Sequence, residues 1–307
     1  MMKSTYQGVL YALVGSILFS IKPVIIKLIY AVEDIDIIHL LLLRMLMSLP
    51  FYLIILLVLH KKKGLSKLSS KGKWHLVLLG FIGFYVASFL DFSGLQYIPA
   101  SLERAIIFLN PTIVLLLSAV FLKRKIKPFQ WLAIVLTYLG IVIACSSTGT
   151  LEQSNHLVIG GTLVFLSAFF YAIYLVGSEF YLRQIGTLEF TCYTMIVAFI
   201  CIAVHYTSTH SIGQLFSLKT EVYMYTFVMA VVSTLIPSFM FSEGIKQIGA
   251  PNGSIIGGIG PVSTIFFAVL ILNETISVAQ LIGTFLVIGG VVIISYGTKK
   301  QKTKTST

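Results

Sequence analysis

The chain has 307 residues, of which 57% are hydrophobic and only 11% are charged, and its formal net charge is +11. A soluble domain carries about a quarter charged residues because its surface faces water, so this composition excludes a soluble protein. In a membrane protein an excess of lysine and arginine marks the cytoplasmic loops. The positive charge therefore indicates a lipid bilayer, and not nucleic acid, as the partner.

Ten apolar segments follow one another along the chain. Crossing a bilayer takes roughly 20 mostly apolar residues in a helix, and backbone polar groups in lipid must be paired within the segment. Each segment is therefore predicted to be a transmembrane α-helix, which makes the fold class an all-α membrane protein. The segments cover approximately residues 6–30, 37–59, 75–97, 101–122, 129–147, 157–182, 189–207, 222–246, 250–272 and 277–297.

The basic residues fall on one side of this predicted membrane protein. With the N-terminus in the cytoplasm, 17 of the 22 lysines and arginines lie in inner loops and tails. The outer loops keep Lys219 alone, and the remaining four lie within spans. The positive-inside rule then predicts that both termini are cytoplasmic.

The second half of the sequence repeats the first half at an offset of 150 residues. The ungapped alignment pairs Gly94 with Gly244 and Pro111 with Pro261, together with identical serine, phenylalanine and glutamine residues. Each half holds five predicted spans, and an odd number makes the second copy enter the membrane from the opposite side. Inverted repeats are typical of secondary transporters, so the repeat predicts transport by alternating access.

Two segments of the repeat resemble a known family. The stretch from Gly94 to Pro111 and the stretch from Ser242 to Thr264 resemble EamA-type members of the drug/metabolite transporter superfamily. The resemblance covers two EamA units, at residues 8–145 and 158–296. It implies two inverted five-helix repeats around a central cavity and movement of small metabolites across the plasma (inner) membrane, without a cofactor.

The sequence departs from the family pattern at two places. Lys123, Arg124 and Lys125 stand in the first half where the second half has an acidic turn at Asn273-Glu274. Asn110 also replaces the aromatic residue that the resemblance leads us to expect before Pro111. Asn110 is therefore a candidate for lining the cavity at this position.

Ionisable residues within spans are costly and are candidates for function. Five of them fall in the outer half of the first repeat: Lys22, Arg44, Asp91, Glu103 and Arg104. Lys22 and Arg44 are predicted to bind a carboxylate or phosphate of the cargo, and the alternatives are ion pairs with Asp91 or Glu103 and snorkelling to the interface. Glu103 and Arg104 are either a gate or a substrate contact near the outer mouth, or an interhelical pair with Asp91 or Arg44.

Asp91 and Glu243 are candidates for proton carriers. A low-dielectric environment favours the protonated form of a carboxylate, and the alternative is that each is a static partner of a nearby cation. Tyr171 and Tyr174 lie three residues apart and are placed to stack on a planar cargo, unless they only pack between helices. Proton coupling and the choice between a monomer and a homodimer stay open.

The predicted hinge and packing positions are prolines and glycines. Pro111 and Pro261 interrupt helical hydrogen bonding at matched places, either as hinges or as tolerated kinks. Gly253 and Gly257 permit close helix approach, and cavity lining is the alternative. The histidines and cysteines show no spacing typical of metal ligands.

These features favour a secondary transporter over other classes. The chain contains no phosphate-binding loop, which disfavours an ATP-driven pump, and no motif of a hydrolase or metalloprotease. We therefore expect no catalytic residues. The predicted cargo is an amino acid or a similar zwitterion or anion that is exported or exchanged, and the alternative is a drug-like or lipid-linked amphiphile that is expelled or flipped.

Overall fold

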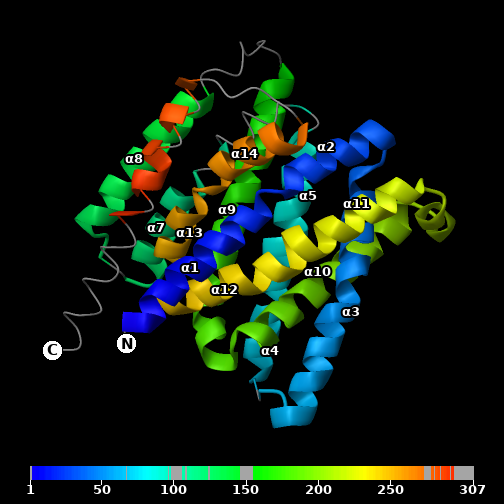
Figure 1. Cartoon of the computed structure of the whole chain (residues 1–307). Helices are drawn as coiled ribbons and strands as arrows, with labels where there is room; N and C mark the ends of the chain where they lie inside the picture. The colour runs from blue at the N-terminus through cyan, green and yellow to red at the C-terminus, as the bar shows by residue number, and fades with distance from the viewer. Residues whose placement is uncertain are drawn as a thin grey trace.

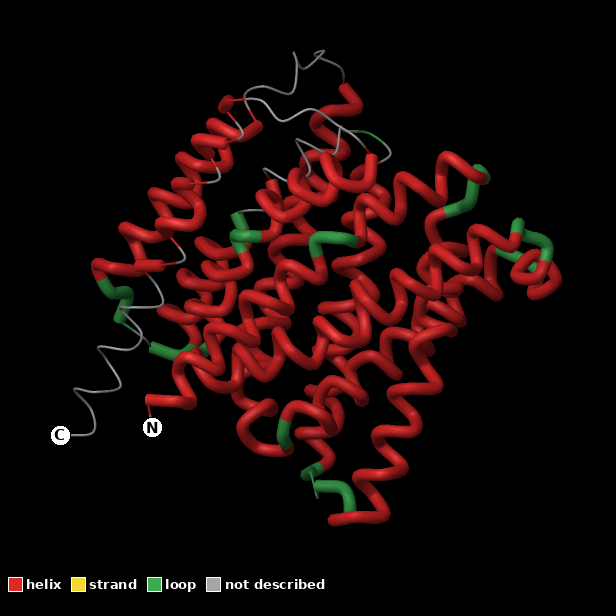
Figure 2. The backbone as a smooth tube through the Cα atoms, in the orientation of Figure 1, coloured by secondary structure: helices red, strands yellow, loops and turns green. Residues whose placement is uncertain are grey.

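The computed structural model describes residues 2–66, 68–95, 97, 106–107, 109–123, 125–145 and 155–272, with 278–279, 281–283, 285–290 and 292–293. Throughout these ranges the chain forms helices joined by short connections, and no strand occurs in them (Figure 2). Seven stretches are long and apolar enough to cross a membrane: Tyr6–Val32, Ile37–Lys62, Ser70–Gly94, Val158–Ile185, Thr187–Thr209, Thr220–Ile248 and Ala250–Ile271. Three shorter apolar helices cover Asn110–Phe121, Pro128–Gly140 and Leu281–Gly290. The protein is thus an all-helical, multi-pass membrane protein.

The helices of the two halves follow each other in a similar order. The first half holds α1 (Met2–Phe19), α2 (Lys22–Val32), α3 (Ile37–Lys63), α4 (Ser70–Gly80), the π-helical turn η1 (Phe81–Val86), α5 (Ala87–Leu95), α7 (Asn110–Phe121) and α8 (Pro128–Cys145). The second half holds α9 (Asn155–Ile185), α10 (Thr187–Thr209), the 3-10 turn η2 (Ile212–Phe216), α11 (Thr220–Ala230), the π-helical turn η3 (Val231–Leu235), α12 (Ile236–Ile248), α13 (Ala250–Gly257) and α14 (Gly260–Leu272).

Local chemistry sets where several of these helices begin and end. The Asp36 carboxylate accepts a hydrogen bond of 2.9 Å from the Ile38 amide at the start of α3, and Ser69 caps α4 in the same way through the Gly72 amide. Such caps pair amides that have no partner inside the helix. At the junctions after α9 and α12, Gly186 and Gly249 both have φ of +86°, a conformation that glycine adopts without strain.

The two halves interlock through reciprocal contacts (Figure 1). Helix α1 packs along α12, and its counterpart α9 packs along α5. Helices α3 and α10 pack against each other, and α4 contacts α10 just as α11 contacts α3. Every one of these contacts joins one half of the chain to the other, so neither half forms a separate bundle.

Small residues allow the closest of these contacts. A Cβ atom on Gly244 would lie 2.8 Å from the backbone nitrogen of Ala12, and one on Gly94 would lie 2.5 Å from a methyl group of Val164. Glycine lets the helix backbones approach each other in this way. The two glycines are partners in the sequence repeat, so the same packing device serves both halves.

Irregular turns also recur at matched places. The π-helical turns η1 and η3 begin at Phe81 and Val231, which are 150 residues apart. Two further interruptions separate α1 from α2 at Ser20–Ile21 and α13 from α14 at Gly258–Ile259. Short π-helical turns within α-helices are often found at functional sites, and all four irregularities reach the cavity described below.

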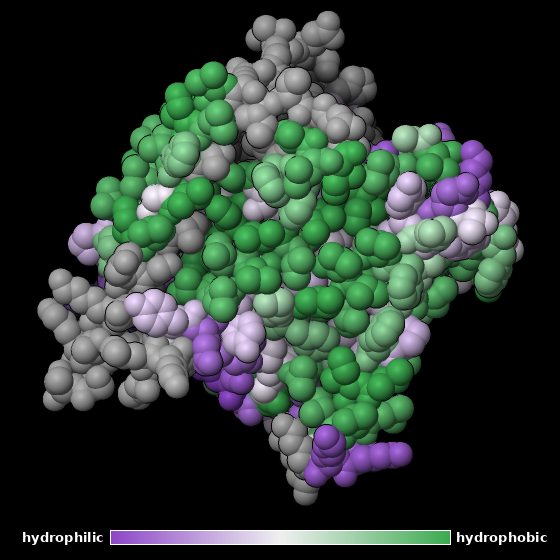
Figure 3. Space-filling model, in the orientation of Figure 1, coloured by the Kyte–Doolittle hydropathy of each residue, from purple (hydrophilic) through white to green (hydrophobic). Residues whose placement is uncertain are grey.

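Apolar side chains cover the outside of the bundle. Leu57 on α3 is 60% exposed and Val204 on α10 is 65% exposed. Figure 3 shows hydrophobic residues over most of the visible face, with hydrophilic residues gathered at its margins. A surface of this kind is matched to the hydrocarbon of a bilayer and not to water.

Candidate functional site

A cavity of about 240 Å³ lies between the two halves. Its walls come from α1, α2, α3, α5, α7, α9, α10, α12, α13 and α14, and from both π-helical turns. Met45 on α3 and Met195 on α10 both line it and are 150 residues apart. The cavity is therefore built from equivalent positions of the two halves.

One part of the cavity wall is charged. Lys22, Arg44 and Asp91 all line it, and the Lys22 Nζ lies 4.0 Å from the Asp91 Oδ2. The Lys22 Nζ also lies 5.2 Å from the centre of the Phe92 ring, within the range of a cation–π contact. The structure thus brings together three of the charged residues that the sequence singles out.

Two charged atoms in this wall have no hydrogen-bond partner within the described part of the chain. They are the Nε of Arg44, whose residue is 5% exposed, and the Oδ1 of Asp91, whose residue is 7% exposed. Leaving a buried donor or acceptor unpaired costs about 1–3 kcal/mol, and more for a charged group. Both side chains thus line the cavity with one polar atom left unpaired among the described residues.

Another part of the wall is aromatic. Phe19 and Phe241 meet edge to face with ring centres 6.2 Å apart, and Phe84 and Tyr171 do so at 6.5 Å. All four residues line the cavity. The wall thus offers an apolar surface beside the charged one.

Tyr174, predicted to act with Tyr171, lies behind this wall. Its ring stacks on Tyr171 with centres 5.7 Å apart and also stacks on Phe190. A Cβ atom on Gly83 would lie 2.4 Å from the Tyr174 ring, so the glycine makes room for it. Tyr174 is 3% exposed and is not among the cavity-lining residues, which leaves it a supporting position.

Asn110 and two of the predicted hinge and packing positions line the cavity, whereas another of them lies at a helix contact. Asn110 lines the cavity and donates a hydrogen bond of 2.9 Å to the Ala168 carbonyl, which fastens the start of α7 to α9. Pro111 and Gly257 also line the cavity. A Cβ atom on Gly253 would instead lie 3.1 Å from Ile245, so this glycine faces a helix contact.

The remaining predicted positions are Pro261, Glu103, Arg104 and Glu243. Pro261 occupies the second position of α14, and Glu103 and Arg104 fall outside the described residues. Glu243 lies near the end of α12, away from the cavity lining. Its carboxylate accepts hydrogen bonds from Thr187, from Gln247 and, at 3.3 Å, from Lys246, and so ties α12 to the start of α10.

Two buried glutamates make contacts that the sequence did not predict. Glu179 on α9 is 2% exposed and accepts a hydrogen bond of 3.0 Å from the Ala250 amide at the start of α13. Glu189 on α10 accepts two hydrogen bonds from Ser66, through its amide at 2.9 Å and its hydroxyl at 2.8 Å. An acidic residue in or beside an apolar span is the signal in the sequence that could have pointed to these two positions. Their amide and hydroxyl donors could not be predicted, because they are far away in the sequence.

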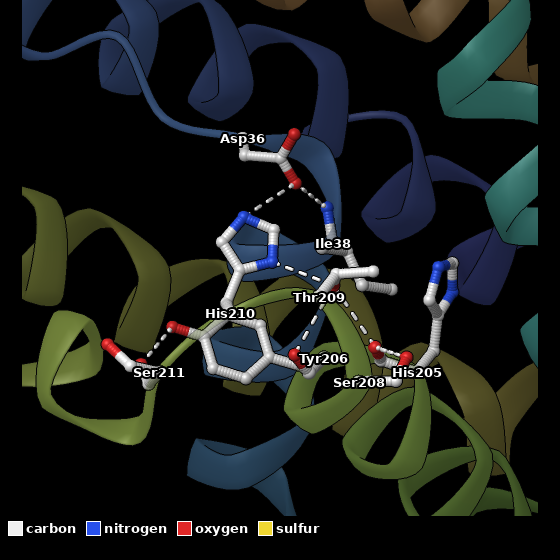
Figure 4. A network of polar contacts seen from close by, with 8 residues as sticks. All are labelled: Asp36, Ile38, His205, Tyr206, Ser208, Thr209, His210 and Ser211. Atoms are coloured by element: carbon white, nitrogen blue, oxygen red, sulfur yellow. Dashed lines mark hydrogen bonds and ion pairs between the residues drawn. The ribbon is translucent and has the colours of Figure 1, made fainter.

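A polar network at the opposite end joins the turn before α3 to the turn after α10 (Figure 4). His210 lies with its Nε2 3.9 Å from the Asp36 carboxylate, and its Nδ1 is 2.8 Å from the Thr209 hydroxyl. The Tyr206 ring stacks on His210 with centres 4.9 Å apart. These contacts hold the ends of α3 and α10 together. Within the ranges described, no three histidine, cysteine or acidic residues are placed to hold a metal ion.

Comparisons with known proteins agree with this architecture. The model of the EamA-like transporter family matches residues 6–146 and 158–296. The chain is 31% identical to the uncharacterized transporter YcbK of Bacillus subtilis (strain 168), over 97% of this chain and 94% of the relative. It is 22% identical to the uncharacterized inner membrane transporter YicL of Salmonella typhimurium, over 98% and 99% of the two chains. One solved crystal structure superposes with a TM-score of 0.79 over 96% of this chain and 98% of that chain, at 15% identity, which shows the shared fold.

Proposed function

The chain belongs to the EamA-like transporter family, and we propose that it is a secondary transporter. Its cargo would be a small zwitterionic or anionic metabolite such as an amino acid. The family match and relatives that are named transporters support the transport role. The cargo class rests on one observation, the cavity in which the Arg44 Nε and the Asp91 Oδ1 are buried without a hydrogen-bond partner among described residues.

The chemistry of the charged wall suits a carboxylate and an amine. A guanidinium group presents a planar fork of donors that matches a carboxylate, so Arg44 would bind the acidic group of the cargo. The unpartnered oxygen of Asp91 would accept from a protonated amine. Lys22, 4.0 Å from Asp91, adds positive charge that favours the anionic end of the cargo.

The size of the cavity favours a metabolite over the larger alternatives. Sites for drug-sized ligands have volumes of about 300–1,000 Å³, and a cavity that holds benzene measures roughly 150 Å³. At about 240 Å³ the cavity lies between these values. A drug-like or lipid-linked amphiphile is therefore the weaker candidate in this conformation.

The proposed mechanism is alternating access by two inverted repeats, covering residues 8–145 and 158–296. The seven long helices and the three shorter ones would make ten spans, five in each half. The reciprocal contacts of α1 with α12 and of α9 with α5 support a two-fold relation between the halves. In such a transporter, exchange of the conformations of the two repeats opens the central site to alternate sides.

We further propose that both termini face the cytoplasm and that the protein lies in the plasma membrane. The one-sided distribution of lysine and arginine supports this orientation. Proton coupling through Asp91 is part of the proposal, because the carboxylate is buried in the cavity and its partner would change when a cargo amine arrives.

The test is transport by the purified protein in proteoliposomes, with labelled amino acids and organic anions, with and without a pH gradient. Uptake and counterflow are both measured, since export and exchange are both possible directions. We expect flux of at least one compound and its loss in Arg44→Met. The matched control is Lys246→Met, which removes a cation outside the cavity lining. Absence of flux for every compound, or unchanged flux in Arg44→Met, would overturn the proposal.

A further inference from the structure

The two halves carry unlike side chains at positions in and around the cavity that are equivalent in the sequence repeat. Gly94 and Gly244 are equivalent in the repeat and pack on Val164 and Ala12, respectively. Val164 and Ala12 are 152 residues apart, so α1 and α2 correspond to α9 at an offset of 152. Over α5 and α12 the offset is 150, as in the sequence repeat.

These offsets pair each charged residue of the wall with an uncharged one. Lys22 corresponds to Tyr174, and Asp91 corresponds to Phe241. Arg44, at the offset of 150 that relates Met45 to Met195, corresponds to Thr194. The charges thus come from the first half alone. Of their three counterparts in the second half, Phe241 lines the cavity, whereas Tyr174 and Thr194 are not among the lining residues.

The unequal side chains divide the cavity along the helices. Phe19 ends α1, Lys22 begins α2 after the turn at Ser20–Ile21, and α2 continues from there toward Asp36. Phe241 lies on α12, which continues toward Glu243 at the opposite end of the bundle. The charged wall therefore lies toward the Asp36 end of the bundle, and Phe241 lies toward the Glu243 end.

The four aromatic residues of the cavity wall belong to one apolar cluster. Phe241 contacts Phe19 edge to face, and Tyr171 contacts Phe84 in the same way. Leu175 on α9 lines the cavity beside them. An apolar group that enters this region leaves water and replaces no hydrogen bond, whereas a charged group there would lose its hydration without a partner.

We propose that Phe241 and Tyr171 form a side-chain subsite that selects zwitterions with a bulky apolar group. The charged head of the cargo lies against Lys22, Arg44 and Asp91, and its apolar group lies against Phe241 and Tyr171. This inference rests on the proposed function. It adds the part of the cavity that would distinguish one amino acid from another by its side chain. Phe241 and Tyr171 are specificity-determining residues because they contact the variable part of the cargo.

The test compares labelled glycine, glutamate, leucine and phenylalanine in proteoliposomes. One methylene group in an apolar pocket changes kcat/KM by about 10–200-fold, so leucine or phenylalanine should exceed glycine by at least about tenfold. Phe241→Ala should reduce this preference about tenfold or more, mainly through KM. Phe241→Leu, which keeps an apolar side chain, should retain most of it.

The control for a general loss of packing is Phe266→Ala on α14, where the side chain is 54% exposed on the outside of the bundle. It should leave the leucine-to-glycine ratio unchanged. If Phe241→Ala does not fold, Tyr171→Ala carries the test and should lower the same leucine-to-glycine ratio, which Phe241→Leu should retain. Arg44-dependent flux with equal preference for glycine, glutamate and leucine would overturn the subsite and keep the proposed function, whereas no flux at all would overturn both.

Discussion

At the scale of single residues, Arg44 best illustrates a buried charge that is retained at a cost. Its side chain is buried between helices, and one of its donors has no partner in the described structure. Removing an ion from water costs several kcal/mol unless its partners compensate. Stability alone does not account for such a residue, and a carboxylate that arrives with the cargo would supply the missing partner.

Glu179 shows the opposite case, a buried carboxylate whose partner lies in the protein. It accepts the Ala250 amide at the start of α13 and an Arg183 nitrogen at 2.9 Å. A charged acceptor at a helix start satisfies an amide that the helix itself leaves unpaired. We assign it a structural role in holding α13 beside α9.

Glu179→Gln should therefore lower stability without changing the selectivity of transport. The amide side chain keeps the shape but weakens the charge-assisted hydrogen bonds, so we expect a loss of about 1–2 kcal/mol. Thermal unfolding in detergent measures the change. Glu221→Gln, at an exposed position in the first turn of α11, is the control and should unfold like the parent. Equal stability of both variants would contradict the role of Glu179.

At the scale of elements, glycine positions decide how closely the helices pack. Gly244 on α12 faces the backbone of α1, whereas a Cβ atom on Gly289 would meet nothing within 4 Å in the described structure. Replacing glycine by alanine inside a helix stabilises it by roughly 0.5–1 kcal/mol when there is room. The same substitution is unfavourable where the new methyl group overlaps another backbone.

Gly244→Ala and Gly289→Ala should therefore shift stability in opposite directions. At Gly244 the added methyl group forces α1 and α12 apart, and overpacking of this kind costs about 1–3 kcal/mol. At Gly289 the gain in helix propensity remains. Unfolding of the two purified variants under identical detergent conditions makes the comparison. Stabilisation by Gly244→Ala would show that the contact between α1 and α12 is looser than the structure has it.

At the scale of the whole molecule, the contacts between the halves carry the architecture. Each half supplies helices that the other half covers, and both matched π-helical turns line the cavity. An arrangement in which equivalent elements surround one site is suited to exchange between two conformations. The same arrangement predicts that connections at opposite ends of the bundle face opposite sides of the membrane.

This orientation is testable by labelling single cysteines in a variant that lacks the three native ones. Ser211→Cys, in the turn after α10, should react with a membrane-impermeant maleimide in intact cells. Ser70→Cys, at the start of α4, should react only after the cells are opened. Both positions are exposed in the structure, so a difference reports sidedness. Labelling of Ser70→Cys in intact cells would reverse the proposed topology.

The sequence predicts some of these features of the protein but not others. Its hydropathy and repeat predicted the helical class and the relation between the halves, and its buried charges pointed to Lys22, Arg44 and Asp91. These signals are local, because lipid penalises each unpaired polar group wherever it falls. The separation of Tyr171 from Tyr174 was not visible, since both lie on one helix and the neighbours from η1 and α10 decide which of them reaches the cavity.

The sequence by itself determined that this protein is a helical membrane protein with a two-fold repeat and with charges concentrated in its first half. Composition and the repeat are enough for these conclusions, because they reflect whether each segment lies in lipid or in water. Only the tertiary structure decided that Lys22, Arg44 and Asp91 share one cavity with Phe241, and that Glu243 lies outside its lining. Such contacts join residues that are far apart in the chain, and they depend on how the helices pack and not on the order of the residues.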